Sequence, residues 1–364
     1  MSRKLRAKSY QNITSQLFKN NKGVALILVL WVIILLMVIV LEFSFAMRQE
    51  VNATRNFKDE IDSYFYAQSG FQRAVAELIK AHTLGIKREE TEEEEKIWRA
   101  DQRKIELKMG EGKVEVIISN ERGKYDLNNI SESMLRRLIS SLGVEERERD
   151  IITDSILDWR DENNLHRING AEDDYYESLP NPYSCKDGPF DTVEELLLVR
   201  GVTPAIFYGS YLNNGEEGEM DGKKGLVDLV TVYSRSTRVD VNTAPKEVLM
   251  SIPGLNPEAV ERIIEARTEE PLRDFRTLRQ LLGNELYVKV FRYLTITPSM
   301  VYSIISTGSV SESGVKRRVK GIVKINSRSE RKYQIMYWAD NYPIAENLAF
   351  LTITPWEKAD EELL

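Results

Sequence analysis

The chain has 364 residues, of which 42% are hydrophobic and 29% charged, and its formal net charge is −7. This acidic balance argues against a nucleic-acid partner, because binding to phosphate requires basic charge. A single cysteine, Cys185, excludes an intramolecular disulfide, and two histidines give no basis for a histidine-rich zinc site.

An apolar segment close to the N-terminus gives the strongest signal. Residues 1–23 contain six Lys or Arg residues and no acidic residue, and the stretch from Val24 to Leu41 is apolar and uncharged. Such a run reaches the length of about 18 residues that crosses a membrane as a helix. The preceding positive charges predict that the N-terminus stays in the cytoplasm and that the rest of the chain is exported.

Three interpretations of this segment remain open from the residues alone. A cleaved secretory signal has a shorter apolar core followed by small residues, and residues 42–48 fit such a cleavage site poorly. An uncleaved anchor is the simplest alternative. In a prepilin-type leader, cleavage falls before the apolar stretch, and a basic segment followed by Gly23 and Val24 suits such a junction.

The segments that follow predict a long helix and then strands. Apolar residues recur at helical spacing from Arg48 to Lys80, which extends the helix beyond the membrane. The charged run at 87–104 is expected to be solvated. Residues 105–118 alternate between polar and apolar around Gly110 and Gly112, which predicts a β-hairpin.

A helical block separates this hairpin from later strands. Residues 131–295 read as mainly helical, whereas runs rich in β-branched and aromatic residues return at 301–307, 315–325 and 333–338. The sequence therefore predicts a helix-plus-sheet domain with an α-helical insertion.

The acidic segment from Asp158 to Glu177 is the first candidate site. It holds seven carboxylates against two arginines, and a hard cation such as calcium would relieve their repulsion. It is not an EF-hand, because Leu165 and His166 stand where that motif needs an oxygen ligand and a glycine. A solvated acidic loop is the simpler alternative. A nuclease-like two-metal site is disfavoured, because no lysine base or phosphate-binding glycine loop accompanies the carboxylates.

Two helix-hairpin-helix elements are predicted, at 193–202 and 242–264. Such hairpins can bind DNA through backbone N–H groups, but Glu258 and Glu261 follow the second turn, where basic or small residues are expected. A structural or protein-binding role is therefore favoured over DNA binding. We find no nucleophile–base pair, P-loop or dinucleotide motif, so an enzyme is not expected; a membrane-tethered metal-dependent hydrolase is the alternative.

The chain resembles the K-class minor pseudopilins of the type II secretion system, also called general secretion pathway protein K. Its most specific part joins residues 158–161 to residues 169–176. Further matching segments extend the resemblance over nearly the whole mature chain: 22–27, 63–67, 198–202 and 241–245.

The resemblance implies an α+β, pilin-like fold: a long N-terminal helix plus an antiparallel sheet, with a large α-helical insertion containing SAM-like and helix-hairpin-helix elements. The expected divisions are a prepilin leader at 1–23, a transmembrane helix at 24–44, the pilin-like helix and first strands at 45–121, the α-helical inserted domain at 122–297, the returning strands at 298–345 and a C-terminal tail at 346–364.

The resemblance also implies how the chain matures and assembles. A prepilin peptidase would cut after Gly23 and leave Val24 as a methylated N-terminus. Most pilin-like proteins carry glutamate at the fifth mature position, where it is thought to pair with the N-terminal amine of a neighbouring subunit; here that position is Leu28. Its absence suits the filament tip, which no subunit covers.

The implied function is a minor pseudopilin at the tip of the pseudopilus, which starts or caps assembly for the export of folded proteins across the outer membrane. The expected partners are I-class and J-class minor pseudopilins, with the chain a single-pass protein of the inner membrane and its bulk in the periplasm. A DNA-binding or DNA-uptake pilus component that uses the hairpin motifs is the alternative.

The family also binds calcium in its helical domain. Oxygen chemistry and spacing select the ligands that we expect here: Asp161, Glu172, Asp173 and Asp174, with Asp158 and Asn163 as the next choices.

Overall fold

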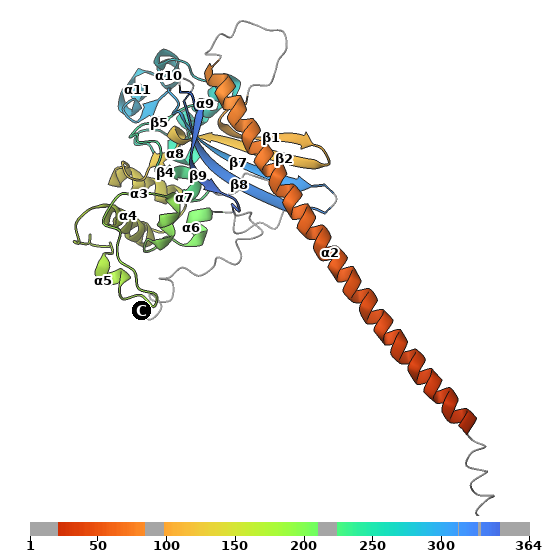
Figure 1. Cartoon of the computed structure of the whole chain (residues 1–364). Helices are drawn as coiled ribbons and strands as arrows, with labels where there is room; N and C mark the ends of the chain where they lie inside the picture. Colours follow the sequence, from red (N-terminus) through yellow and green to blue (C-terminus); the bar gives the residue numbers. More distant parts are fainter. Residues whose placement is uncertain (1–20, 84–97, 210–223, 312, 327–328, 343–364) are drawn as a thin grey trace, which may run out of the picture. The chain divides into compact units, whose positions relative to one another are not determined.

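A computed structural model describes residues 21–83, 98–209, 224–311, 313–326 and 329–342 (Figure 1). The chain divides into two compact units, Met1–Ile61 and Asp62–Leu364, which are described separately. Helix α2 (Asn21–Thr83) contributes to both.

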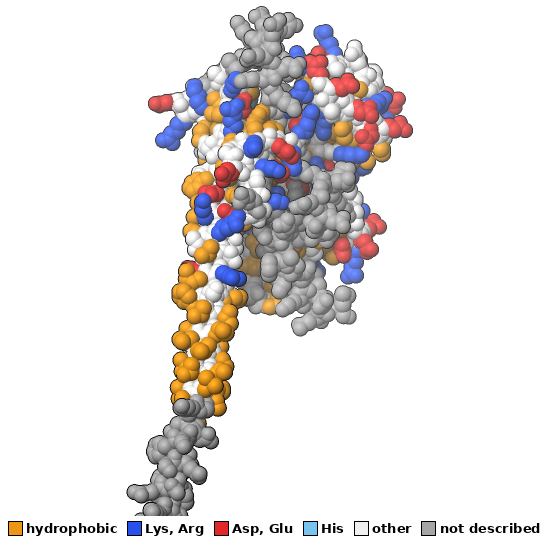
Figure 2. All heavy atoms as spheres, turned by 90° about the vertical axis from the view of Figure 1, so that its right-hand side faces the viewer, with side chains coloured by type: hydrophobic (Ala, Val, Ile, Leu, Met, Phe, Trp, Pro, Cys, Tyr) orange, Lys and Arg blue, Asp and Glu red, His pale blue; other side chains and the backbone are white. Residues whose placement is uncertain are grey.

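The first unit contains the apolar part of α2. Its large apolar side chains from Val24 to Leu41 are 45–69% exposed, and they form the apolar surface of this helix in Figure 2. Among the described residues, α2 is the helix with the length and composition to cross a membrane. A continuous apolar surface of this length is unstable in water, so this part of α2 is a single membrane anchor.

The second unit begins with the remainder of α2, which packs on a five-stranded antiparallel sheet of order β1-β2-β7-β8-β9. The strands are β1 (Asp101–Met109), β2 (Gly112–Asn120), β7 (Val301–Val310), β8 (Lys316–Ile325) and β9 (Tyr333–Ala339). The predicted long helix, hairpin and returning strands are therefore confirmed.

Glycines allow α2 to approach this sheet closely. A Cβ atom on Gly70 would lie 2.4 Å from Cγ1 of Val114, and one on Gly308 would lie 2.1 Å from the carbonyl oxygen of Ser63. A buried apolar core fills the rest of the contact. It comprises Ala67, Phe71, Ala74, Val75, Leu78, Val114, Val116, Ile118, Tyr302, Ile304, Val319, Val323 and Ile325.

Two contacts show how α2 runs along the sheet. Near the start of the second unit, Ser63 donates a 2.9 Å hydrogen bond to the carbonyl oxygen of Val315, in the turn between β7 and β8. At the other end, Nε2 of His82 lies 2.8 Å from the hydroxyl of Tyr302, at the start of β7. The helix therefore meets the sheet beside the β7–β8 turn and ends at the opposite ends of the strands, beside the start of β7.

The helical insertion leaves the sheet at these same strand ends, after β2. The buried side chain of Asn120, at the end of β2, donates to the carbonyl oxygen of Ser299 (2.8 Å) and accepts from its N–H (3.0 Å). One amide thus joins the outgoing chain to the returning chain. Because Asn120 pairs with Tyr302 across β2 and β7, the insertion starts and ends next to His82.

The insertion contains two halves that each begin and end with a short strand, preceded by the short helix η1 (Glu121–Gly123). The first half comprises β3 (Tyr125–Asp126), α3 (Glu132–Ser141), α4 (Glu146–Arg160), α5 (Asp173–Tyr176), η2 (Val193–Leu198), α6 (Pro204–Tyr208), α7 (Leu226–Leu229) and β4 (Val230–Thr231). The second comprises β5 (Val239–Asp240), α8 (Lys246–Met250), α9 (Pro257–Glu269), α10 (Phe275–Leu282), α11 (Asn284–Val290) and β6 (Leu294–Thr295). In each half the first strand pairs in parallel with the last.

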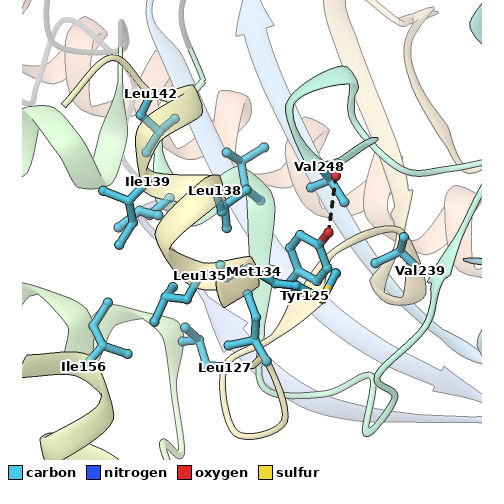
Figure 3. Packing of buried hydrophobic residues seen from close by; sticks show 14 of the residues in the cluster. Tyr125, Leu127, Met134, Leu135, Leu138, Ile139, Leu142, Ile156, Val239 and Val248 are labelled. Carbon is cyan, nitrogen blue, oxygen red and sulfur yellow. Dashed lines mark hydrogen bonds between the residues drawn. The ribbon is translucent and has the colours of Figure 1, made fainter. Parts of the chain in front are cut away.

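The two halves share one hydrophobic core. Figure 3 shows Tyr125 of β3 between side chains of α3, such as Leu138, and Val239 of β5 and Val248 of α8. The buried hydroxyl of Tyr125, in β3, donates a 3.3 Å hydrogen bond to the carbonyl oxygen of Val248 (Figure 3). The insertion is therefore one packed body.

The predicted hairpins differ in their helices. In the second, Asn256 accepts a 2.9 Å hydrogen bond from the N–H of Ala259 and begins α9 as predicted. In the first, residues 193–198 form the 3₁₀ helix η2, because a capping box at Thr192 and Glu195 starts a short turn that ends before Gly201. Gly201 has a φ of +84°, which glycine adopts without strain.

Candidate functional site

The acidic segment lies in a loop between α4 and η2, in the first half of the insertion. Aromatic side chains hold this loop on the core of the insertion: the ring centroids of Trp159 and Tyr176 are 5.3 Å apart, and those of Tyr176 and Tyr183 are 5.2 Å apart. The acidic residues are therefore anchored to packed elements at both ends of the loop.

Asp158 and Asp161 are both bound by one arginine. Asp158 is fully buried in the last turn of α4 and accepts a 3.0 Å hydrogen bond from the N–H of Arg167, whose guanidinium also binds it. The same guanidinium lies 2.8 Å from Oδ2 of Asp161. A Cβ atom on Gly170 would lie 1.7 Å from Oδ2 of Asp158, so only glycine fits there.

Three other predicted ligands are turned to other contacts. Asp173 accepts a 2.8 Å hydrogen bond from the N–H of Cys185 and a 3.2 Å hydrogen bond from Asn164. Asn163 is exposed and binds the side chain of Asp161, and Asp174 is exposed at the start of α5. The structure does not bring these residues to one point.

Glu172 differs from the other predicted ligands, because its carboxylate is buried and has no ion-pair or hydrogen-bond partner of the usual geometry among the described residues. It is 1% exposed, and neither of its carboxylate oxygens has a hydrogen-bond partner that meets the usual geometry. One ligand atom each from Glu172, Cys185 and Asp187 lie within 4.8 Å of one another. Oδ1 of Asp187 is also buried without a hydrogen-bond partner. Buried polar atoms of this kind are rare, and an ion is one of the groups that satisfies them.

The electrostatics of this cluster favour a cation. Burial raises the pKa of Glu172 to about 7, with the nearby carboxylates of Asp158 and Asp187 acting in the same direction and the weak thiol donor of Cys185 opposing them. Burial also raises the pKa of the Cys185 thiol far above its usual range. A bound cation would offset both effects, because it favours the deprotonated groups.

The residues present therefore fit a divalent cation, although not with the full set of expected ligands. Glu172 and Asp187 supply the oxygen atoms that calcium prefers, whereas Asp158 and Asp161 already share Arg167. Sequence reasoning missed Asp187 and Cys185, because both lie beyond the acidic run. The available signal was their one-residue spacing on either side of Lys186 in a loop.

The predicted processing residues lie in the anchor. Gly23 and Val24 belong to the first turn of α2, and Val24 is 64% exposed. Leu28 is 62% exposed, so an apolar side chain stands on the outer surface of the anchor at that position.

These features define a class: an α+β, pilin-like protein with one membrane anchor and a large helical insertion at the end of its sheet. Residues 117–208 match the family described as "Type II secretion system (T2SS), protein K", and residues 234–285 match a helix-hairpin-helix motif. The two matches fall on the two halves of the insertion.

Known proteins extend the match. The type II secretion system protein K of Pseudomonas aeruginosa is 25% identical over 329 residues, which cover 85% of this chain and 93% of that protein. Its counterpart from Aeromonas hydrophila is 40% identical over 73 residues, or 20% of this chain and 22% of that protein. The crystal structure of the GspK-GspI-GspJ complex from enterotoxigenic Escherichia coli contains a chain with the same fold, at 15% identity and a TM-score of 0.50, covering 81% of this chain and 98% of that one.

The chain is therefore similar to type II secretion system protein K over most of its length. That family is a structural component of a secretion apparatus and not a known enzyme class.

Proposed function

We propose that this chain is the tip subunit of the type II secretion pseudopilus, where it starts or caps assembly for the export of folded proteins. The place of the insertion carries the proposal. It grows from the strand ends beside His82, where α2 ends, and not from the opposite strand ends beside Ser63, where α2 meets the sheet. In a filament of parallel helices, a subunit stacked beyond those strand ends would collide with the insertion.

Leu28 supports the same position. A glutamate at the fifth mature position of other pilin-like proteins is thought to neutralise the N-terminal amine of a neighbouring subunit. Leu28 has no charge with which to form that pair. A subunit that lacks the contact is suited to a place with no neighbour above it.

The proposed partners are minor pseudopilins of the I and J classes. The solved relative is named as a complex of GspK with GspI and GspJ, and we extend that assembly to this chain. The exposed apolar surface of α2 is the part that we expect to pack against their helices once the anchor leaves the membrane.

The tip position can be tested by locating this chain on assembled filaments. In cells that overproduce the major pseudopilin, gold-labelled antibodies against this chain should bind at filament ends. A Leu28→Glu variant should still be found at filament ends, because the insertion blocks a further subunit whether or not this charge is present. Labelling of the unaltered chain along the whole length would contradict the proposal.

We also propose that a prepilin peptidase cuts after Gly23, in an inner-membrane protein whose N-terminus is cytoplasmic and whose bulk is periplasmic. N-terminal sequencing of the mature protein should then begin at a methylated Val24. A Gly23→Val variant should keep its leader and migrate as a larger protein. Maturation of that variant to normal size would refute the leader.

Calcium is the ion that we propose for the cluster at Glu172 and Asp187, with a structural role. Bound there, it would neutralise two carboxylates that no described residue pairs with. The side chains of this chain hold the loop in place around it, chiefly through Arg167 and the aromatic contacts of Tyr176. We expect the ion to have no catalytic role. Removal of the ion by a chelator should therefore loosen the loop and have no other effect.

The helix-hairpin-helix match leaves DNA binding as the second candidate function. At the second hairpin, Glu261 forms an ion pair with Lys246, so this basic group is already neutralised. Binding to duplex DNA that is tight and weakens steeply with added salt would favour this alternative. We expect no such binding.

A further inference from the structure

The β1–β2 turn lies at the end of the sheet opposite to the insertion, and two lysines lie beside it on neighbouring strands. Lys108 of β1 and Lys113 of β2 are directly opposite one another in the strand register. We infer that this lysine pair binds an acidic surface of the adjacent minor pseudopilin on the membrane side of this chain. The inference rests on the proposed tip position and adds the surface that contacts the next subunit.

Strand register places the lysine pair on the open face of the sheet. Val114, the residue after Lys113, is buried in the core beneath α2, and successive side chains of a strand point to opposite faces. The lysine pair therefore lies on the face that α2 does not cover, and both side chains are exposed. The same row continues across the sheet with Ser309 of β7 and Lys316 of β8.

Among the described residues, none neutralises the lysine pair. The acidic residues of the adjacent row, Glu106 and Glu115, bind Lys104 on their other side, at 3.3 and 2.9 Å. Glu111, in the turn, forms no ion pair with either lysine. Like charges directly opposite one another destabilise a sheet, so an anionic partner would relieve a repulsion that the chain carries alone.

Protection of a strand edge is the simpler explanation for one of the two lysines. β1 is an edge strand, and a lysine on an edge discourages pairing with another chain. This accounts for Lys108 but not for Lys113, because β2 is paired on both sides. The doubled charge therefore indicates a role beyond protection of the edge.

The arrangement of the domain selects the partner. The insertion begins and ends at the strand ends beside His82, whereas Ser63 meets the sheet at the opposite strand ends, near the lysine pair (Figure 1). A tip subunit blocked by its insertion on one side must contact its neighbour through the other strand ends. Aspartate or glutamate on that neighbour would neutralise both lysines and fix the register of the two subunits.

The test mixes the full chain in detergent with the purified I-class and J-class minor pseudopilins of the same secretion system. The double variant Lys108→Glu, Lys113→Glu should bind one of them roughly 10- to 100-fold more weakly than the unaltered chain. Added salt should weaken binding of the unaltered chain more than binding of the variant. A carbodiimide, which joins amines directly to carboxylates, should link Lys108 or Lys113 to an Asp or Glu of that partner.

Lys324→Glu is the matched control, because Lys324 is an exposed lysine of β8 on the same face but near the other strand ends. It should bind as the unaltered chain does, and circular dichroism should show that every variant is folded. Equal affinity of the unaltered chain and the double variant, or an equal loss in Lys324→Glu, would overturn the inference and leave the proposed partners intact.

Two further results would also overturn it. Binding of the unaltered chain to neither pseudopilin would refute the proposed partners themselves. Anionic lipid is the competing partner, and the chain can be reconstituted in vesicles with and without phosphatidylglycerol. Protection of the lysine pair from acetylation only with this lipid, together with unchanged binding of the double variant to the pseudopilins, would assign the pair to the membrane.

Discussion

The two halves of the helical insertion are built on one hydrogen-bond pattern. In the first half, the amide of Asn128 donates to the carbonyl oxygen of Phe190 (3.0 Å) and accepts from its N–H (2.8 Å). In the second, Asn242 makes the same two contacts with Leu272, at 3.0 and 2.8 Å. Each asparagine therefore ties the segment after its β-strand to the segment that precedes η2 in the first half and α10 in the second.

An arginine completes the pattern in both halves. Arg160, at the end of α4, donates to the carbonyl oxygens of Leu127 and Ile130. Arg267, in α9, donates to those of Val241 and Ala244. In each half a glycine with a positive φ lies in the turn between the first two helices. Gly143, between α3 and α4, has a φ of +75°, and Gly254, between α8 and α9, has a φ of +98°.

The halves differ in what separates the arginine from the clamped segment. In the second half, only residues 268–271 lie between Arg267 and Leu272, whereas in the first half residues 161–189 lie between Arg160 and Phe190. That longer connection is the loop with the acidic residues and Cys185. The comparison shows a shared scaffold on which one half carries an added loop, where function is commonly placed.

The largest expected effect comes from a glycine specific to the added loop. Gly170→Ala places a methyl group against Asp158 and separates this buried carboxylate from Arg167. Leaving a buried charge uncompensated costs roughly 3–5 kcal/mol. We expect urea unfolding to show this loss.

Gly254→Ala in the second half is the matched control. It introduces only backbone strain, of about 1–2 kcal/mol, because no atom lies within 3.4 Å of the added carbon. Equal losses in the two variants would show that the contact of Gly170 with Asp158 is unimportant.

Removal of the proposed cation should affect one half alone. An ion present at a thousandfold excess over its dissociation constant stabilises the folded protein by about 4 kcal/mol. Chelation should therefore speed hydrogen exchange in residues 161–189 and in the adjoining part of α4. Exchange around Leu272 should be unchanged. Uniform acceleration across both halves would break the proposed asymmetry.

The two arginines should be equivalent. Arg160→Ala and Arg267→Ala each leave two carbonyl oxygens without a charged donor, and each should lower the free energy of unfolding by about 2–3 kcal/mol. Arg→Lys at either position should recover only part of this, since one ammonium lacks the spread of the guanidinium. A large loss in one half with none in the other would argue that the repeated contacts are not equivalent.

The smallest effect concerns pH. Asp240 is fully buried, and burial raises its pKa above the ordinary value of 3.8 despite hydrogen bonds from Asn242 and Thr243. The folded state therefore binds more protons, and the contribution of Asp240 to stability declines as pH rises from 3.8 through its folded pKa. Comparison of the pH profiles of the unaltered protein and Asp240→Asn should show this slope only in the former; identical profiles would refute it.

The long elements were predictable because each carries its own periodic pattern. The hairpin at Gly110 and Gly112 follows from alternation of apolar residues, the three returning strands from runs of β-branched and aromatic residues, and α2 from helical spacing. The repeat was missed, because its defining contacts join Asn128 to Phe190 and Asn242 to Leu272, far apart in the chain. A short signal existed in the matching segments Asp126-Leu127-Asn128 and Asp240-Val241-Asn242.

The sequence by itself determined the anchor, the long helix and the interruption of a sheet by a helical block, because these depend on local hydrophobic patterns and chain order. It also identified the segment in which acidic groups gather. Only the tertiary structure decided which of those groups are available. Arg167 neutralises Asp158 and Asp161, while folding of the loop brings Cys185 and Asp187 to Glu172. Charge pairing is a property of distances in space, which spacing along the chain does not specify.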